Sequence, residues 1–229
     1  MSVFCVTGID TDIGKSYATG LIARYLLARG LRVTTQKLVQ TGQDGGISQD
    51  ILTHRRLMGV EPDGLDQLGT TCRQTFKYPA SPHLAAAMEG REIDCAAITE
   101  ATEDLQRRFQ VVLLEGAGGI HVPLSLDYLT ADYLEAMQYP LIVVSSGKLG
   151  TINHTLLTLE AAARRDIPLA GIVYNNYIPA EDPIRIDTLA VFKHYLDKYG
   201  RPGAIVEMPE TGLDGGTVDF GPLFKGFDL

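Results

Sequence analysis

The segment TGIDTDIGKS, residues 7–16, places two glycines, a lysine and a hydroxyl side chain in an order that suits phosphate binding. Five residues separate Gly8 from Gly14, one more than in the common phosphate-binding pattern. An apolar stretch precedes the segment and a helical pattern follows it, which is the context that such a loop requires. We therefore expect Lys15 to reach the terminal phosphates of a nucleotide and Ser16 to ligate magnesium. The alternative is an ordinary glycine turn with a solvated lysine.

A carboxylate and several glycines follow the apolar segment VVLL. Glu115 ends this segment, and Gly116, Gly118 and Gly119 lie in the loop after it. A carboxylate at this position can support the metal of a bound nucleotide, although an acid at a strand end often only caps a helix. The glycines let a ligand approach the backbone closely. Together with Lys15, Glu115 predicts one shared metal–phosphate group.

Two further side chains are placed where they could join this group. Lys37, in KLVQTG, lies at the end of the second predicted strand, LRVTTQKLV. Its loop should neighbour the phosphate-binding loop, because functional loops of parallel sheets gather at the carboxyl ends of the strands. A lysine at a strand end is more often solvated, so this neighbouring loop is what favours a functional role. Asp50, near the start of the next helix, is either another metal carboxylate or a helix-start acid.

The later loops carry weaker signals. In SSGKLGTINHT, residues 145–155, Lys148 and Asn153 either bind substrate or form an ordinary turn and helix cap. Asn175 and Asn176 end another apolar segment, and their amides could read the edge of a nucleobase.

The five histidines are scattered, with no spacing typical of a metal site. His83 could touch the substrate, because it lies in the segment SPH. The others are expected to be surface or packing residues: His54, His121, His154 and His194.

The elements that must position these residues follow from the apolar pattern. Segments rich in Val, Ile and Leu alternate with helical patterns along the chain. We therefore expect an α/β fold with a mostly parallel sheet and helices on both faces. No repeat or linker interrupts the pattern, which predicts one domain over residues 1–229. Residues 210–229 begin with a glycine-rich stretch, and we expect them to form a flexible tail.

The overall composition disfavours several classes of protein. A formal net charge of −8 disfavours nucleic acid as a partner, because phosphate backbones attract basic surfaces. No apolar run approaches the roughly 20 residues that a membrane-spanning helix needs. The sequence begins without a charged leader, so we expect a cytoplasmic protein. Cys5, Cys72 and Cys95 lack metal-ligand spacing and are expected to be reduced thiols, with a catalytic cysteine as the less favoured alternative.

In combination, these motifs resemble those of the dethiobiotin synthetase family of biotin biosynthesis. The opening loop of that family is similar to TGTDTxVGKT, with the same five residues between the glycines. Further similarities are KPVxSG (here KLVQTG), SPH, VEGAGG (here LEGAGG) and KLGxINH (here KLGTINH), in the same order from Thr7 to about Asn176. The resemblance implies a P-loop NTPase-like fold and an enzyme that converts 7,8-diaminononanoate, CO2 and ATP to dethiobiotin, ADP and phosphate, using Mg2+.

The resemblance also implies roles for individual residues. Lys15 and Lys37 should flank the transferring phosphoryl group, with Lys37 as the principal catalytic residue. The implied magnesium ligands are Ser16, Asp50 and Glu115. The implied nucleotide-binding residues are Asp12, Ile13, Gly14, Lys15, Ser16, Tyr17, Asp50, Glu115, Gly116, Ala117, Gly118, Asn175 and Asn176. The implied substrate-binding residues are Thr41, Ser81, Gly118, Leu149, Gly150 and Asn153, the last three near the subunit boundary of a homodimer.

Some positions depart from the family pattern. Ser16 replaces a threonine, Tyr17 stands where a small residue or threonine is common, and Leu38 replaces the proline after the catalytic lysine. The segment VEMPETG, residues 206–212, resembles the base-binding loop of the family only weakly. We therefore expect weaker discrimination in favour of adenine than is usual in the family.

Two other functions are alternatives. A related amidoligase would phosphorylate a carboxylate before attaching ammonia, but such enzymes normally carry a glutaminase domain, for which this chain has no room. A nucleotide switch, such as a partition or division-site ATPase, usually has a signature lysine early in the phosphate loop, where this sequence has Asp10. Such switches also often carry a basic or amphipathic surface, which the acidic composition disfavours.

Overall fold

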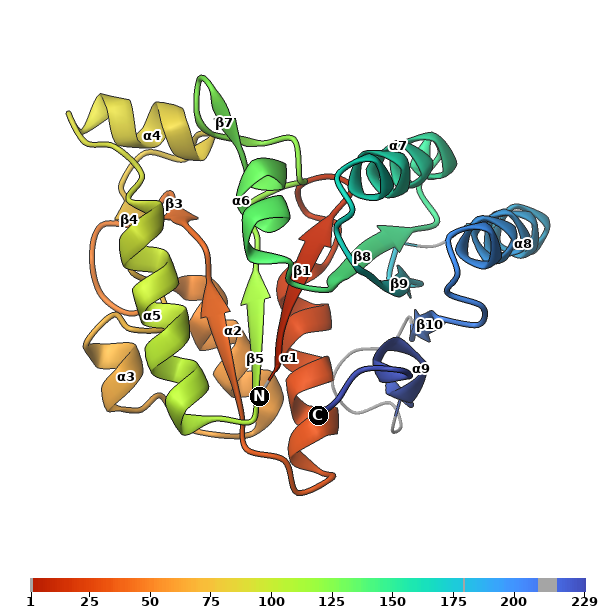
Figure 1. Ribbon diagram of the computed structural model, residues 1–229, viewed down its shortest axis with the longest axis horizontal. Helices are drawn as coiled ribbons and strands as arrows, with labels where there is room; N and C mark the ends of the chain where they lie inside the picture. The colour runs from red at the N-terminus through yellow and green to blue at the C-terminus, as the bar shows by residue number, and fades with distance from the viewer. Residues whose placement is uncertain (1, 179, 210–217) are drawn as a thin grey trace.

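The computed structural model describes residues 2–178, 180–209 and 218–229. Within these residues the central sheet has six strands, all parallel, in the order β10-β9-β8-β1-β5-β2. Helices lie on both sides of it (Figure 1), which confirms the expected α/β fold with a mostly parallel sheet. The strands of the sheet are β1 (Ser2–Gly8), β2 (Val33–Lys37), β5 (Val111–Glu115), β8 (Leu141–Ser146), β9 (Leu169–Asn175) and β10 (Ile205–Met208).

Helices and two small strand pairs make up the other regular elements of the described chain. The longer helices are α1 (Lys15–Leu27), α2 (Gln49–Met58), α5 (Cys95–Arg108), α6 (Thr130–Met137), α7 (Thr151–Arg164) and α8 (Asp182–Lys198). The shorter helices are α3 (Gly64–Gln67), α4 (Pro82–Met88) and α9 (Gly221–Phe224). The strand pairs are β3 (Gln40–Thr41) with β4 (Thr75–Phe76), and β6 (Pro123–Ser125) with β7 (Tyr128–Leu129).

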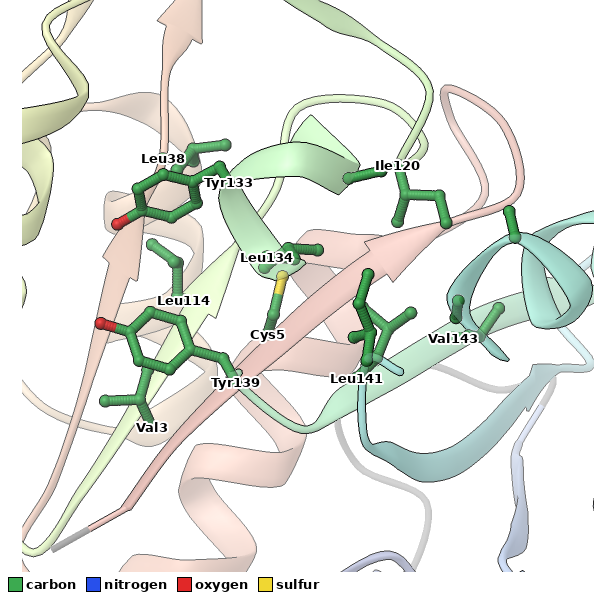
Figure 2. Close-up of a cluster of buried hydrophobic side chains, with 14 of the residues drawn as sticks. Val3, Cys5, Leu38, Leu114, Ile120, Tyr133, Leu134, Tyr139, Leu141 and Val143 are labelled. Atoms are coloured by element: carbon green, nitrogen blue, oxygen red, sulfur yellow. The ribbon is translucent and has the colours of Figure 1, made fainter. Parts of the chain in front are cut away.

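The sheet is buried on both faces, and β1, β5, β8 and β9 are mostly apolar along consecutive positions rather than only at alternate ones. Side chains of a strand point alternately to the two faces, so Val3 and Cys5 of β1 join one hydrophobic core while Phe4 and Val6 join the other. Figure 2 shows the first core, in which Cys5 lies beside side chains from α6 and β8. Burial raises the pKa of the Cys5 thiol to about 12, so this thiol stays protonated.

Different helices cover the two faces. The core around Phe4 is closed by α1, by the end of α2 and by α9. The core around Val3 is closed by α5, α6, α7 and α8. This two-sided packing holds the strands rigidly, so that the loops after their carboxyl ends have a fixed base.

The end of the chain packs closer to the sheet than the sequence suggested. Residues 210–217, part of the expected flexible tail, lie outside the described residues. The following segment returns to the core, where Phe220, Leu223 and Phe224 are buried. The rings of Phe224 and Phe4 meet edge to face, with their centroids 4.9 Å apart. In residues 218–229, these buried side chains pack against the sheet.

No helix in the described part of the chain has both the length and the apolar character needed to cross a lipid bilayer.

Candidate functional site

The loop between β1 and α1 has the backbone conformation of an anion-binding turn. Gly14 precedes α1 with φ of 94°, a left-handed value that favours glycine. Asp12 also has a left-handed φ, of 53°. Within the described residues, no side chain makes a capping hydrogen bond at the start of α1, and no acidic residue lies in its first turn. The N–H groups of this turn are therefore suited to bind a phosphate, which the helix dipole also favours.

Lys15 lies at the first position of α1 and is buried. Its Nζ donates a hydrogen bond to the carbonyl oxygen of Asp10, 2.9 Å away, so the side chain folds back over its own loop. Burial lowers the pKa of Lys15, and the charge of Lys37 lowers it further. Lys15 and Lys37 both line one cleft, so the fold brings the two side chains into the same region.

Lys37, at the end of β2, is clamped between two carboxylates. Its Nζ lies 2.5 Å from Asp50 Oδ2 and 2.7 Å from Glu115 Oε1, and it donates to the carbonyl of Gly116 at 3.1 Å. Burial alone would lower the pKa of Lys37, but Glu115 and Asp50 outweigh it and raise the pKa above its usual value. Lys37 is therefore a permanent cation at neutral pH.

Glu115 is completely buried at the end of β5. Burial favours its neutral form, but Lys37 and His54 hold the pKa of this carboxyl far below its usual range. The folded pKa is lower than the unfolded one, so the stabilisation from Glu115 is present at neutral pH and is lost as acid protonates the folded protein. Glu115 is thus a carboxylate under ordinary conditions.

Ser16 completes the cluster from the start of α1. Its Oγ lies 3.0 Å from Asp50 Oδ1 and 3.0 Å from Glu115 Oε1, so its single proton can be donated to only one of them at a time. No group of three or more His, Cys, Asp or Glu side chains suited to a metal occurs among the described residues. Two carboxylates and a hydroxyl are nevertheless a donor set that fits Mg2+, which usually keeps waters and takes further oxygens from substrate phosphates.

These side chains line one cleft of about 1500 Å³ at the carboxyl ends of the strands. Most of the residues predicted for nucleotide, metal or substrate line it, namely Asp12, Gly14, Lys15, Ser16, Tyr17, Lys37, Thr41, Asp50, Glu115, Ala117, Gly118 and Asn175. The fold therefore brings the phosphate loop and the ends of β2, β5 and β9 together.

The remaining predicted residues do not line the cleft. Ile13 is buried in the hydrophobic core around Phe4, and Gly116 contributes its carbonyl to Lys37. Four predicted substrate residues lie at helix starts away from the cleft: Ser81 before α4, and Leu149, Gly150 and Asn153 around the start of α7. Leu149 is 91% exposed, and Asn153 is exposed as well.

The two asparagines at the end of β9 are already engaged by the protein. Asn175 donates from Nδ2 to the carbonyl of Ile13 and accepts through Oδ1 from the N–H of Tyr177, both at 3.0 Å. Asn176 donates to Glu207 Oε2 at 3.1 Å. Asn175 therefore ties the phosphate loop to β9, a contact that sequence reasoning did not anticipate.

Sequence reasoning also missed a contact of His54, which it assigned only to the surface or to packing. His54 is fully buried, and its Nε2 lies 2.6 Å from Glu115 Oε2. The available signal was the spacing of four residues between Asp50 and His54, which places both on one face of α2. By contrast, His121, His154 and His194 are exposed as expected.

Several known proteins are similar to this chain in sequence. A family model described as an AAA domain matches residues 2–200. The chain is 49% identical to the ATP-dependent dethiobiotin synthetase BioD of Chlorobaculum tepidum, over 92% of this chain and 88% of that protein. It is also 46% identical to the ATP-dependent dethiobiotin synthetase BioD 2 of Pasteurella multocida, over 90% of this chain and 96% of that protein. This chain belongs to the dethiobiotin synthetase family. The resemblance inferred from its motifs is thereby confirmed.

Solved structures show the same fold in more distant proteins. The signal recognition particle receptor FtsY from Elizabethkingia anophelis matches 97% of this chain with a TM-score of 0.52 and 13% sequence identity. Chloroplast FtsY from Physcomitrella patens matches with a TM-score of 0.51 and 15% identity. This chain spans 63% of the length of each of those chains. The likeness shows that this member of the dethiobiotin synthetase family has a P-loop NTPase fold.

The phosphate loop of this family member gives a first testable prediction. Gly14→Ala and Gly30→Ala both place a side chain at a left-handed φ, which should lower the free energy of unfolding by about 1–2 kcal/mol. A Cβ on Gly14 also overlaps the Asn175 amide, whereas a Cβ on Gly30 meets no atom of the described residues within 4 Å. We expect nucleotide affinity, measured by titration calorimetry, to fall about 10-fold or more in Gly14→Ala alone. Equal affinities in the two variants would contradict the assignment of the loop.

Proposed function

We propose that this protein is an ATP-dependent dethiobiotin synthetase that acts on 7,8-diaminononanoate, CO2 and ATP. One amine of the diamine takes up CO2 as a carbamate, a carbamate oxygen receives the γ-phosphoryl group, and the second amine displaces phosphate to close a cyclic urea. The observation that carries the proposal is the convergence of Lys15 and Lys37 on a carboxylate and hydroxyl cluster beside the phosphate loop. Membership of the family supplies the substrates.

The reaction needs positive charge more than it needs a covalent catalyst. The carbamate, the γ-phosphate and the departing ADP are all anionic, so a site for them must neutralise charge and align the reacting oxygens. Lys15 and Lys37 supply two ammonium groups in one cleft. Cys5 and Cys72 are buried and have raised pKa values, so neither provides a thiolate nucleophile.

Magnesium fits the oxygen cluster as the metal of this site. Ser16, Asp50 and Glu115 would hold it directly or through water. When bound, Mg2+ would neutralise part of the negative charge of the nucleotide phosphates. Lys37, which is paired with both carboxylates in this structure, would then carry its charge to the transferring group as the principal catalytic residue.

The substrate end of the proposed site draws on two regions. Thr41 and Gly118 lie in the cleft and would line the diamine. Gly150 precedes α7 with φ of 94°, and no side chain among the described residues caps this helix start, so its N–H groups suit an anionic tail. Because Leu149 is almost fully exposed, we propose that this helix start completes the site of a second copy in a homodimer. We also propose a cytoplasmic location, since the reaction uses soluble metabolites.

Neither alternative function gains support. An amidoligase would use ammonia from a glutaminase domain, and the curated relatives of this chain are named dethiobiotin synthetases over nearly their full length. In the place of the signature lysine of a switch ATPase, Asp10 forms an ion pair with Lys148 at 3.5 Å.

Release of phosphate distinguishes these functions. We expect the purified protein with MgATP to release phosphate only when 7,8-diaminononanoate and bicarbonate are both present, with dethiobiotin detected by mass spectrometry. Phosphate release with neither added would indicate a switch. Release that depends on ammonia and a carboxylate substrate would indicate an amidoligase.

Removing the charge of Lys37 should affect turnover more than nucleotide binding. In Lys37→Ala we expect kcat to fall about 100–1,000-fold, because the charge is needed mainly in the transition state. The dissociation constant for ATP should change by less than about threefold. Steady-state kinetics and calorimetry measure the two quantities.

The Lys37→Ala experiment needs a check of folding. Breaking a buried ion pair can lower the free energy of unfolding by about 3–5 kcal/mol, because Glu115 loses its nearest cation. Urea unfolding identifies the concentration range in which the variant is native. Lys193→Ala, which changes an exposed lysine of α8, is the matched control. Turnover of Lys37→Ala close to that of the control would show that Lys37 is misassigned.

The engagement of both asparagines supports the expected weak discrimination in favour of adenine. Asn175 and Asn176 are committed to the phosphate loop, to Tyr177 and to Glu207, so fewer of their donors and acceptors can read a base. We expect kcat/KM for GTP and CTP to lie within about 10-fold of that for ATP, a difference of about 1.4 kcal/mol. A preference for ATP of several hundred-fold would refute this expectation.

A further inference from the structure

His54 is a fully buried polar side chain with a hydrogen-bond partner at each ring nitrogen. Its Nε2 lies 2.6 Å from Glu115 Oε2, and its Nδ1 lies 3.0 Å from Thr35 Oγ1. The ring therefore bridges β2 and β5 from its position on α2. A buried histidine with two good partners is a fixed group rather than a mobile one.

The hydrogen bonds behind His54 set which ring nitrogen carries the proton. Arg55 Nη1 donates to Thr35 Oγ1 at 2.9 Å, and Arg55 is itself held by Asp66 at 2.8 Å from both Nε and Nη2. Because Thr35 Oγ1 accepts from Arg55, its own proton is available to His54 Nδ1. The neutral ring then carries its proton on Nε2 and donates it to Glu115, and a protonated ring donates there as well.

The two carboxylate oxygens of Glu115 thus have separate partners. Oε2 faces His54, while Oε1 faces Lys37 Nζ at 2.7 Å and Ser16 Oγ at 3.0 Å. One oxygen is held by the protein interior and the other is directed to the cleft. Without a donor at Oε2, the carboxylate could turn about its last bond and present either oxygen to the cleft, or lie between the two orientations.

We propose that His54 is a positioning residue, which fixes the orientation of the Glu115 carboxylate so that Oε1 is preorganised for a divalent cation. This inference rests on the proposed function, because it takes Glu115 as a metal ligand. Residues that orient a metal ligand from behind typically change metal affinity or activity 10- to 100-fold when they are replaced. His54 itself is not among the residues that line the cleft.

Two substitutions separate the contacts of the ring. The amide nitrogen of glutamine can take the place of Nε2 and donate to Glu115, whereas asparagine is shorter and can replace only Nδ1, which faces Thr35. Both variants keep a buried polar amide. His194→Asn, at an exposed position of α8, is the matched control.

The readout is the affinity for Mn2+, a paramagnetic substitute for Mg2+, measured by electron paramagnetic resonance of free Mn2+ with a non-hydrolysable ATP analogue. We expect His54→Asn to bind Mn2+ about 10- to 100-fold more weakly than wild type. His54→Gln should recover most of this loss, and His194→Asn should match wild type. Equal affinity in His54→Asn and His54→Gln overturns the proposal, even if both are less stable to urea.

Two further variants cover the other outcomes. If His54→Asn does not fold, His54→Leu replaces it in the experiment, because leucine fills a similar volume and has no hydrogen-bond donor. A His54→Leu variant that binds Mn2+ as tightly as wild type overturns the proposal. Glu115→Gln tests the proposed function separately. Unchanged Mn2+ affinity in Glu115→Gln removes Glu115 from the metal site. If Glu115→Gln binds Mn2+ more weakly but His54→Asn and His54→Gln do not differ, only the role of His54 is rejected and Glu115 remains a metal ligand.

Discussion

The structure depends on keeping the Glu115 carboxylate charged in the interior. An isolated carboxylate without contact with water would be strongly destabilised, so it needs cations and donors on every side. Lys37 from β2, Ser16 from α1 and His54 from α2 provide them. These three elements come from different parts of the chain, so the charge on Glu115 both requires their packing and fixes it. Glu115 therefore links β2, α1 and α2 at one end of the cleft.

The same arrangement places several charged groups close together in the cleft before any ligand binds. Two ammonium groups and two carboxylates lie within one cleft, and Lys37 is shared between the carboxylates. Such a site is preorganised, because the charges are already oriented by the fold and little reorganisation is left for the reaction. The buried ion pair of Arg55 with Asp66 also supports the site, because Arg55 donates a hydrogen bond to Thr35, which in turn contacts His54. The side chains that stabilise this part of the fold are therefore the same ones that are proposed to carry out the reaction.

The sequence predicted the sheet and most of the cleft, for a reason that is physical. Continuous apolar segments imply parallel strands, and parallel strands bring their following loops together, so Lys15, Lys37 and Glu115 could be grouped without coordinates. It could not predict that α2 turns His54 toward Glu115, because spacing gives the face of a helix but not the element which that face meets. Nor could it show that Asn175 is already bonded to the phosphate loop, since side-chain partners across the fold leave no local pattern.

We propose one cleft in which two ammonium groups and a divalent ion serve the same phosphoryl group. A crystal structure with Mg2+, a non-hydrolysable ATP analogue and 7,8-diaminononanoate tests this most directly. It should place the γ-phosphate within hydrogen-bond distance of both Lys15 and Lys37, with the metal at Ser16, Asp50 and Glu115. A γ-phosphate out of reach of Lys37, or a metal bound away from Glu115, would contradict the account.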